Sequence, residues 1–348
     1  MRIKREFGIG RPLGLCLSLL IVLLIVAAPA SAVEVTIRSW AAPTASHYLH
    51  DAMVAEDGSI WYAARYSNTL GRFDPITETW DEYVTDIADS GPHGLKEDPD
   101  GNIWFTAIGA DPTYIGMLNV KTREFTEYPV TLAIHSPNEP TPANAHSLIL
   151  DDRGYAWFTM ISADMLGRLD TNTGEIRLAR SPIRNVGVYS VELDSQQVPW
   201  FSLFRTNLLI RVEPESMDVK SYQAPWPDAR PRRIAISDDD AVWYTDFMRG
   251  RLGRFDPTSE TWNEWLSPGG EWSRPYGMVA LGDEIWYSES WKDPSRLVRF
   301  DTKTEEFQSW PVDDCLDGAY NIVADDESNL WFVCHDTDRL VKVEITGR

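Results

Sequence analysis

Three histidines occupy matching positions along the 348-residue chain. His50, His93 and His146 each stand eleven residues before a tryptophan. Three neutral imidazoles, completed by a carboxylate or a water, form a ligand set that suits zinc, iron or copper. The same imidazoles could instead act as general bases, bind a substrate, or only hydrogen-bond water and neighbouring strands. Which of these roles is open to them depends on the elements that position them.

The tryptophans mark a repeat that runs through the chain. They are separated by 43, 53, 43, 43, 43 and 45 residues, and they are Trp61, Trp104, Trp157, Trp200, Trp243, Trp286 and Trp331. Each unit has an apolar run, an acidic or glycine-containing turn, the tryptophan-bearing run and two further short runs, without helical periodicity. Four short strands in about 43 residues are typical of one blade of a β-propeller.

The two ends of the chain complement each other. The last unit stops after its third run, at 340–345, and an unpaired strand edge there could pair with other chains. Residues 35–40 read like the fourth run of the other units. We therefore predict an all-β, seven-bladed β-propeller over residues 33–348, closed by the N-terminal strand. A closed ring has no built-in need to oligomerise, so we expect a monomer.

Because blades are related by rotation, equivalent positions lie at one height around the axis. The position of the three histidines is filled in the other units by polar or aromatic residues, namely Tyr189, Arg232, Tyr276 and Tyr320. We interpret these four as substrate-binding residues, with Arg232 pairing with a carboxylate or phosphate. Asp246 and Glu289 stand three residues after their tryptophans and return to the same face.

These positions give a candidate catalytic site at the channel mouth. His93 or His146 would be the general base, and the predicted metal ligands are His50, His93, His146, Glu289 and Asp246. The two carboxylates would orient a divalent ion. The alternative for each acid is a solvated loop charge, which is common in so acidic a chain.

The N-terminus resembles an export signal. Four basic residues precede or flank an apolar run at 13–28, and small residues follow at 30–32. We predict a signal peptide over residues 1–32, hence a periplasmic or secreted protein without stable membrane insertion. An uncleaved membrane anchor is the alternative.

Two cysteines remain after the predicted leader, Cys315 and Cys334. An even count in an oxidising compartment favours a disulfide between them, and two free buried thiols are the alternative. Beyond the leader, 28 basic and 52 acidic residues leave a net charge of −24. Such a charge repels phosphate backbones, so we expect no nucleic-acid partner.

Several units resemble the repeat of the streptogramin B (virginiamycin B) lyases. The motifs that carry the resemblance are PHGLKEDPDGNIWFTA, RPYGMVALGDEIWYSE and LGRFDPTSETWNEW. The resemblance covers residues 33–348 and implies a seven-bladed propeller. It also implies a lyase that opens a cyclic depsipeptide by elimination, with a magnesium ion and a histidine base near the channel mouth.

At the positions of the family's functional residues, this chain has other residue types. The family's base would fall at Tyr320 and a partner histidine at Tyr276, while its glutamates would fall at Gly318 and His335. We therefore carry two hypotheses: a metal-assisted lyase or hydrolase acting on a small molecule or cyclic peptide, and a non-catalytic propeller that binds a small ligand, a peptide or a cell-wall fragment. The cofactor would be magnesium by resemblance, or zinc, iron or copper if the three histidines converge.

Overall fold

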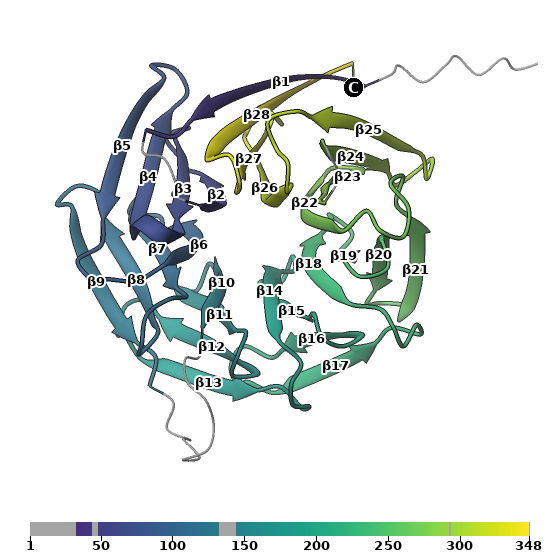
Figure 1. Cartoon of the computed structure of the whole chain (residues 1–348). Helices are drawn as coiled ribbons and strands as arrows, with labels where there is room; N and C mark the ends of the chain where they lie inside the picture. The colour runs from purple at the N-terminus through teal and green to yellow at the C-terminus, as the bar shows by residue number, and fades with distance from the viewer. Residues whose placement is uncertain (1–32, 44–47, 132–143, 292–293, 348) are drawn as a thin grey trace, which may run out of the picture.

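The structure, a computed structural model, describes residues 33–43, 48–131, 144–291 and 294–347. Seven four-stranded antiparallel sheets surround a central channel (Figure 1). The predicted seven-bladed all-β fold is confirmed. The predicted signal peptide, 1–32, lies outside the described residues. Within those residues the one helical element is a 3-10 turn, η1 (Arg65–Ser67), and none is long and apolar enough to span a membrane.

Each blade runs from an innermost strand at the channel to an outermost strand at the rim. The innermost strands are β2 (Leu49–Val54), β6 (Pro92–Glu97), β10 (Ala145–Leu150), β14 (Val188–Leu193), β18 (Pro231–Ile236), β22 (Pro275–Leu281) and β26 (Ala319–Ala324). The second strands, which carry the tryptophans, are β3 (Ile60–Ala64), β7 (Ile103–Ala107), β11 (Tyr155–Met160), β15 (Pro199–Leu203), β19 (Val242–Asp246), β23 (Glu284–Glu289) and β27 (Leu330–Cys334).

The outer half of each blade completes the sheet. The third strands are β4 (Thr69–Asp74), β8 (Tyr114–Asn119), β12 (Met165–Asp170), β16 (Leu208–Val212), β20 (Arg251–Asp256), β24 (Ser295–Asp301) and β28 (Arg339–Thr346). The outermost strands are β5 (Thr79–Val84), β9 (Glu124–Pro129), β13 (Ile176–Arg180), β17 (Val219–Gln223), β21 (Thr261–Leu266), β25 (Phe307–Val312) and β1 (Glu34–Ala41).

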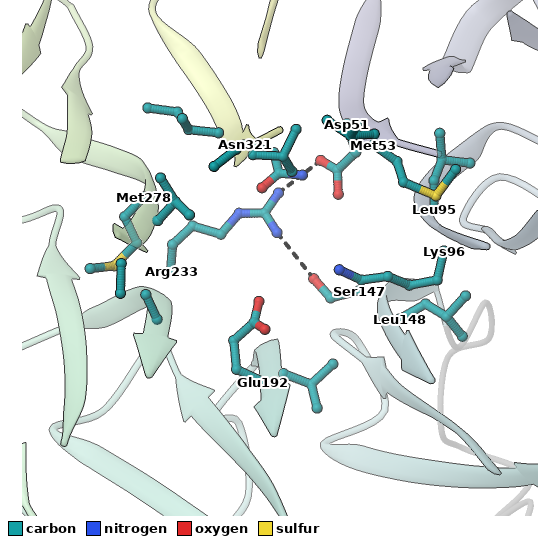
Figure 2. A pocket seen from close by; sticks show the side chains of 18 of the residues that line it. Asp51, Met53, Leu95, Lys96, Ser147, Leu148, Glu192, Arg233, Met278 and Asn321 are labelled. Atoms are coloured by element: carbon teal, nitrogen blue, oxygen red, sulfur yellow. Dashed lines mark hydrogen bonds and ion pairs between the residues drawn. The ribbon is translucent and has the colours of Figure 1, made fainter. Parts of the chain in front are cut away.

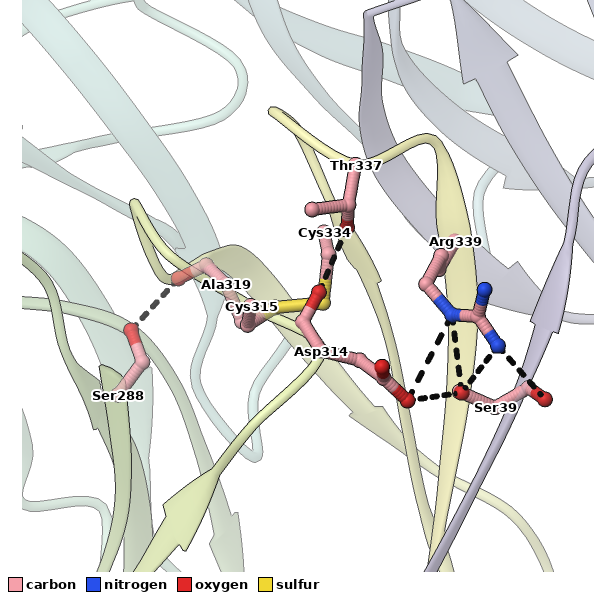
Figure 3. The surroundings of a disulfide bond; sticks show 8 residues. All are labelled: Ser39, Ser288, Asp314, Cys315, Ala319, Cys334, Thr337 and Arg339. Carbon is pink, nitrogen blue, oxygen red and sulfur yellow. Dashed lines mark hydrogen bonds and ion pairs between the residues drawn. A yellow bond between two sulfur atoms is a disulfide. The ribbon is translucent and has the colours of Figure 1, made fainter. Parts of the chain in front are cut away.

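The ring closes as predicted, because the N-terminal strand completes the sheet formed by the C-terminal strands. β1 pairs antiparallel with β28 from Glu34 opposite Thr346 to Ala41 opposite Arg339. The Arg339 guanidinium also donates to the Ser39 hydroxyl at 2.8 and 3.0 Å, and this hydroxyl bonds Asp314 (Figure 3). The closing strand therefore supplies both the backbone ladder and a side-chain clamp to the seventh blade.

The repeated tryptophans hold adjacent blades together. Each indole is at most 2% exposed, and Trp104 packs in the cluster of the following blade with Leu148 and Phe158. In four blades the indole N–H donates to a turn carboxylate six residues earlier, as from Trp104 to Asp98 at 2.8 Å. That carboxylate also accepts backbone N–H groups of its own turn, so one acid orders both the hairpin turn and the indole.

A disulfide joins Cys315, before β26, to Cys334 at the end of β27 (Figure 3). The Cα atoms are 5.2 Å apart, within the usual range for a disulfide. Both residues are buried in the core of the seventh blade. The disulfide therefore ties the loop entering β26 to the strand beside it, in the blade that closes the ring.

Candidate functional site

A β-bulge at the start of every innermost strand positions the site. In the first blade, Leu49 pairs with Ala64 and Ala52 pairs with Tyr62, so two residues, His50 and Asp51, stand opposite one. The same shift occurs in the other six innermost strands. A bulge inserts one extra residue and re-aims the side chains beside it. Two successive residues per blade thereby become available to the channel.

Buried hydroxyls on the second strands satisfy the backbone at these bulges. The Thr106 hydroxyl accepts from Gly94 N at 2.9 Å and donates to the His146 carbonyl of the next blade at 2.7 Å. Thr159 repeats the arrangement with Ser147 N and the Tyr189 carbonyl. Each hydroxyl links one bulge to the next, so the heads of the innermost strands are fixed relative to one another.

The seven predicted head residues meet in one ring around the axis, which we call the histidine face. Ring centroids are 3.6 Å apart for His50 and His93, 4.1 Å for His93 and His146, and 4.1 Å for His146 and Tyr189. The circuit continues through Tyr276 and Tyr320 at 4.6 Å and returns from Tyr320 to His50 at 5.2 Å. The imidazoles of blades one to three therefore converge, and side chains close this end of the channel.

Arg232 completes the ring between two tyrosines. Its guanidinium lies 4.1 Å from the Tyr276 ring centroid and 5.1 Å from that of Tyr189, and it donates to the Tyr276 hydroxyl at 3.1 Å. The Tyr189 and Tyr276 hydroxyls bond each other. Burial raises the pKa values of Tyr276 and Tyr320 above the ordinary tyrosine value, so both stay protonated at neutral pH. The four residues predicted to bind substrate thus lie in the ring with the histidines.

Burial and nearby cations keep the three histidines neutral. His50, His93 and His146 are 5%, 1% and 4% exposed. Desolvation lowers the pKa of each well below 6.5, and the positive charge of Arg233 lowers it further. Neutral imidazole is the form that binds metals and accepts protons. All three therefore have the protonation state required for either role.

Hydrogen bonds orient two of the three imidazoles. His50 Nδ1 lies 2.9 Å from Asp51 Oδ1, and His146 Nδ1 lies 3.0 Å from the Ser147 hydroxyl and 3.2 Å from the Tyr189 carbonyl oxygen. The Asp51 carboxylate and the Tyr189 carbonyl accept hydrogen bonds, so bonds to them place the proton on Nδ1 and leave each Nε2 with its lone pair. His93 differs, because its buried Nδ1 has no hydrogen-bond partner among the described residues. An unpartnered buried nitrogen is uncommon and indicates a missing ligand or water.

His50, Asp51 and His93 could together hold a metal ion. One potential ligand atom from each lies within 4.8 Å of the others, the sole such group of three among the described residues. Magnesium, which the family resemblance implies, prefers oxygen ligands. Two imidazoles and one carboxylate do not fit it, whereas they fit zinc, iron or copper.

Other groups engage the two carboxylates predicted as metal ligands. Asp246 accepts from the Arg249 guanidinium at 2.7 Å and from Arg230 N at 3.2 Å. Glu289 Oε1 accepts from the Ser267 hydroxyl at 2.5 Å and from Gly269 N at 2.6 Å, while its buried Oε2 has no partner in the described part of the chain. Neither belongs to the group formed by His50, Asp51 and His93.

Sequence reasoning missed Asp51 and Arg233, which lie one position after the head residues. Arg233 crosses the channel, donating to Asp51 Oδ1 at 2.9 Å and to the Tyr320 carbonyl at 2.9 Å, and it contacts the Ser147 hydroxyl at 3.4 Å (Figure 2). One signal was available. The position after the heads holds one acid and one arginine among small or neutral residues, in blades that nearly face each other.

A comparison with models of protein families identifies the chain's relatives. The model of the virginiamycin B lyase family matches residues 137–348. The chain belongs to this family. No curated protein matches the sequence.

Solved structures of this fold include virginiamycin B lyase from Staphylococcus aureus, alone and as a catalytically inactive variant with quinupristin. Each is 22% identical, has a TM-score of 0.78, and is matched over 90% of this chain and 100% of that one. The extracellular domain of a one-component system from B. thetaiotaomicron is also similar, with 15% identity, a TM-score of 0.63, and coverage of 86% and 40%. At these identities the likeness shows a shared fold.

Proposed function

We propose that this member of the virginiamycin B lyase family is a metal-assisted lyase or hydrolase that acts on a small molecule or cyclic peptide at the histidine face. One observation carries the proposal: the His93 imidazole is buried between His50 and His146 and leaves Nδ1 without a partner beside Asp51. An unsatisfied buried polar atom costs stability, so its presence here supports a functional role or a bound ligand.

In this proposal a divalent transition metal binds to His50, Asp51 and His93. When bound, such an ion would act as a Lewis acid that stabilises negative charge developing on a substrate oxygen. His146 is the general base, because its Nδ1 contacts the Ser147 hydroxyl and the Tyr189 carbonyl, and its Nε2 is left to accept a proton. Arg232 pairs with an anionic group of the substrate.

The surface beside the histidine face supports a bulky apolar substrate. Trp272 and Trp291 are 72% and 62% exposed. The Arg274 guanidinium lies 5.5 and 5.0 Å from their ring centroids, and 5.1 Å from Phe247, which also contacts Arg232. Exposed aromatic rings arranged around a cation suit a ligand with aromatic or apolar groups and a carbonyl-rich backbone.

Quinupristin, the molecule present with the S. aureus enzyme variant, is the probe that tests this proposal. The protein, loaded with zinc or iron, is incubated with quinupristin and the products are separated and weighed by mass spectrometry. Elimination opens the ring without a change in mass, whereas hydrolysis adds one water. Either product, lost in His146→Ala but kept in the rim variant Lys303→Met, supports the proposal. Absence of both product and binding contradicts a streptogramin-like substrate.

The tight packing of the ring favours a second candidate, a non-catalytic propeller that binds a small ligand, a peptide or a cell-wall fragment. A substrate would have to reach imidazoles that are 1–5% exposed. Binding to the exposed aromatic surface, by contrast, requires no such access. Quinupristin binding without any product, unchanged in His146→Ala, would favour this candidate over the enzyme.

We also propose that the protein is exported and acts as a monomer. The disulfide and the leader-like residues 1–32 support export, because disulfides persist in oxidising compartments. The closed ring supports the monomer. N-terminal sequencing of the periplasmic and culture fractions tests export, with cleavage after Ala32 expected. The full-length chain in the cytoplasm would contradict it.

A further inference from the structure

A cavity occupies the channel on the side away from the histidine face. It has a volume of about 510 Å³ and is lined by all seven innermost strands (Figure 2). Its lining starts at the residues just after the heads, such as Asp51 and Ser147, and extends to the far ends of the strands, such as Ala324. None of the head residues contributes. We call this cavity the lower chamber; it adjoins the site described above and shares Asp51 with it, but none of the three histidines lines it.

The charges that separate the lower chamber from the histidines are already paired. Arg233 and Asp51 are 6% and 4% exposed and form an ion pair of 2.9 Å. The remaining donors of Arg233 reach the Tyr320 carbonyl and the Ser147 hydroxyl. A molecule in the chamber would therefore find this boundary neutral and largely satisfied. Recognition would have to come from other groups.

Two unpaired side chains of opposite charge point into the chamber. Lys96 comes from the second blade and Glu192 from the fourth, at equivalent positions, and Figure 2 shows both pointing toward the cavity. Both are half-buried. No side-chain hydrogen bond or ion pair joins either of them to a described residue. Burial raises the pKa of Glu192, and the positive charges of Lys96 and Arg233 act in the opposite direction.

Apolar side chains also line the chamber. Met53, Leu95, Leu148 and Met278 all line the chamber. Methionine adapts its shape to different ligands, and apolar walls with a few placed polar groups are typical of small-molecule sites. A half-buried charge without a partner is costly, and a bound counter-charge removes that cost.

We propose that the lower chamber binds a small zwitterion with an apolar side chain, an amino acid or a dipeptide. Its ammonium group pairs with Glu192, its carboxylate pairs with Lys96, and its side chain packs on the methionines and leucines. A ligand with both charges would pair with Lys96 and Glu192 at once, while the other lining acid, Glu97, already accepts from Glu56 N at 2.6 Å. An anion would leave Glu192 unpaired, and a cation would leave Lys96 unpaired. The ligand contacts proposed here use Lys96 and Glu192, neither of which takes part in the proposed activity at the histidine face.

Calorimetric titration with four probes tests the proposal without any mutation. L-leucine and the dipeptide Leu-Leu carry both charges, N-acetyl-L-leucine lacks the ammonium group, and L-leucinamide lacks the carboxylate. At least one of the two zwitterions should bind, and each singly charged analogue of leucine should bind about tenfold or more weakly, because a charge-assisted hydrogen bond is lost. Absence of binding by both zwitterions, or equal binding of the analogues, would overturn the proposal.

Variants locate the site. Lys96→Met and Glu192→Gln should each weaken binding of the zwitterion about tenfold or more, with thermal unfolding showing that each variant remains folded. The matched control, Lys303→Met, removes an exposed lysine at the rim and should bind as the wild type does. His93→Ala should also leave binding unchanged, which separates this result from the fate of the proposed enzyme. Unchanged binding in both chamber variants would contradict the assignment.

Discussion

Arg233 of the fifth blade bonds Asp51 of the first blade across the central channel, at 2.9 Å. Asp51 Oδ1 also lies 2.9 Å from His50 Nδ1. One carboxylate therefore orients a histidine of the candidate site and anchors the arginine that bounds the lower chamber. Because the partners come from blades that nearly face each other, the pair also braces the ring from inside.

Removing the arginine should destabilise the propeller. Arg233→Met leaves Asp51 buried with only His50 as a partner, and breaking a buried ion pair costs about 3–5 kcal/mol. Denaturant unfolding monitored by tryptophan fluorescence measures the loss. The double variant Arg233→Met/Asp51→Asn also removes the unpaired carboxylate charge and should recover part of the lost stability. Equal stabilities for the single and double variants would show that the pair is not coupled.

The histidines should make the protein sensitive to acid. Their folded pKa values lie well below the value near 6.5 expected when unfolded, so below about pH 6.5 the unfolded chain binds more protons. Stability is therefore fully present above that pH and declines as pH falls, by up to about 1.4 kcal/mol per pH unit for each histidine. Arg233, Arg232, Arg65 and His335 reinforce the depression at His50, while Asp51 opposes it at His93.

Unfolding free energies between pH 7 and pH 5 test this linkage. His93→Gln should reduce the slope of the unfolding free energy against pH by the contribution of one histidine, because one titrating group is gone. Metal must be chelated in these measurements, since a bound ion would also depend on pH. An identical slope in wild type and variant would contradict the assignment of His93 as a neutral buried group.

The disulfide should contribute measurably to stability. Cys315 and Cys334 are separated by 19 residues, and closing a loop of this size in the unfolded chain corresponds to about 3 kcal/mol in the chain-entropy model. The variant Cys315→Ser/Cys334→Ser should lose about this amount in denaturant unfolding. Treatment with a reductant should lower the unfolding free energy of the wild type toward that of the variant. It should leave the unfolding free energy of the variant unchanged. A reductant effect of equal size on both proteins would exclude the disulfide as its cause.

The N-terminal strand should be needed for a monomeric ring. Deleting residues 33–41 removes β1, exposes the edge of β28 and removes Trp40 from its stack on Trp331, where the ring centroids are 5.8 Å apart. An exposed edge strand pairs with other chains. Light scattering should therefore show dimers or aggregates of the truncated protein and monomers of the untruncated one. A stable monomeric truncation would mean that ring closure is dispensable.

The sequence predicted the blades well because their signals are local and repeated. The tryptophans, the turn acids and the terminal strand at 35–40 all follow one repeated pattern. The rotation that relates the blades then places His50, His93 and His146 side by side. Their convergence required only that equivalent positions share a height.

The rest of the site depends on departures from that pattern. Strict alternation along β2 would turn Asp51 away from the side of His50, and the bulge overrides it. The Arg233 to Asp51 bond joins residues 182 positions apart, without a local signal. Asp246 and Glu289 accept hydrogen bonds from nearby loop residues such as Arg249 and Gly269. The spacing of the tryptophans does not predict the conformations of these loop residues.

Zinc titration of chelator-treated protein at pH 7.5 tests directly whether His50, Asp51 and His93 form a metal centre. We predict one site per chain, at least tenfold weaker in His50→Ala and in His93→Ala, and unchanged in Lys303→Met. Magnesium should not compete at equal concentration, because the donors are mainly nitrogen. If zinc, iron and copper all fail to bind the wild type, or if zinc binding is unaffected in both histidine variants, these residues do not form a metal centre.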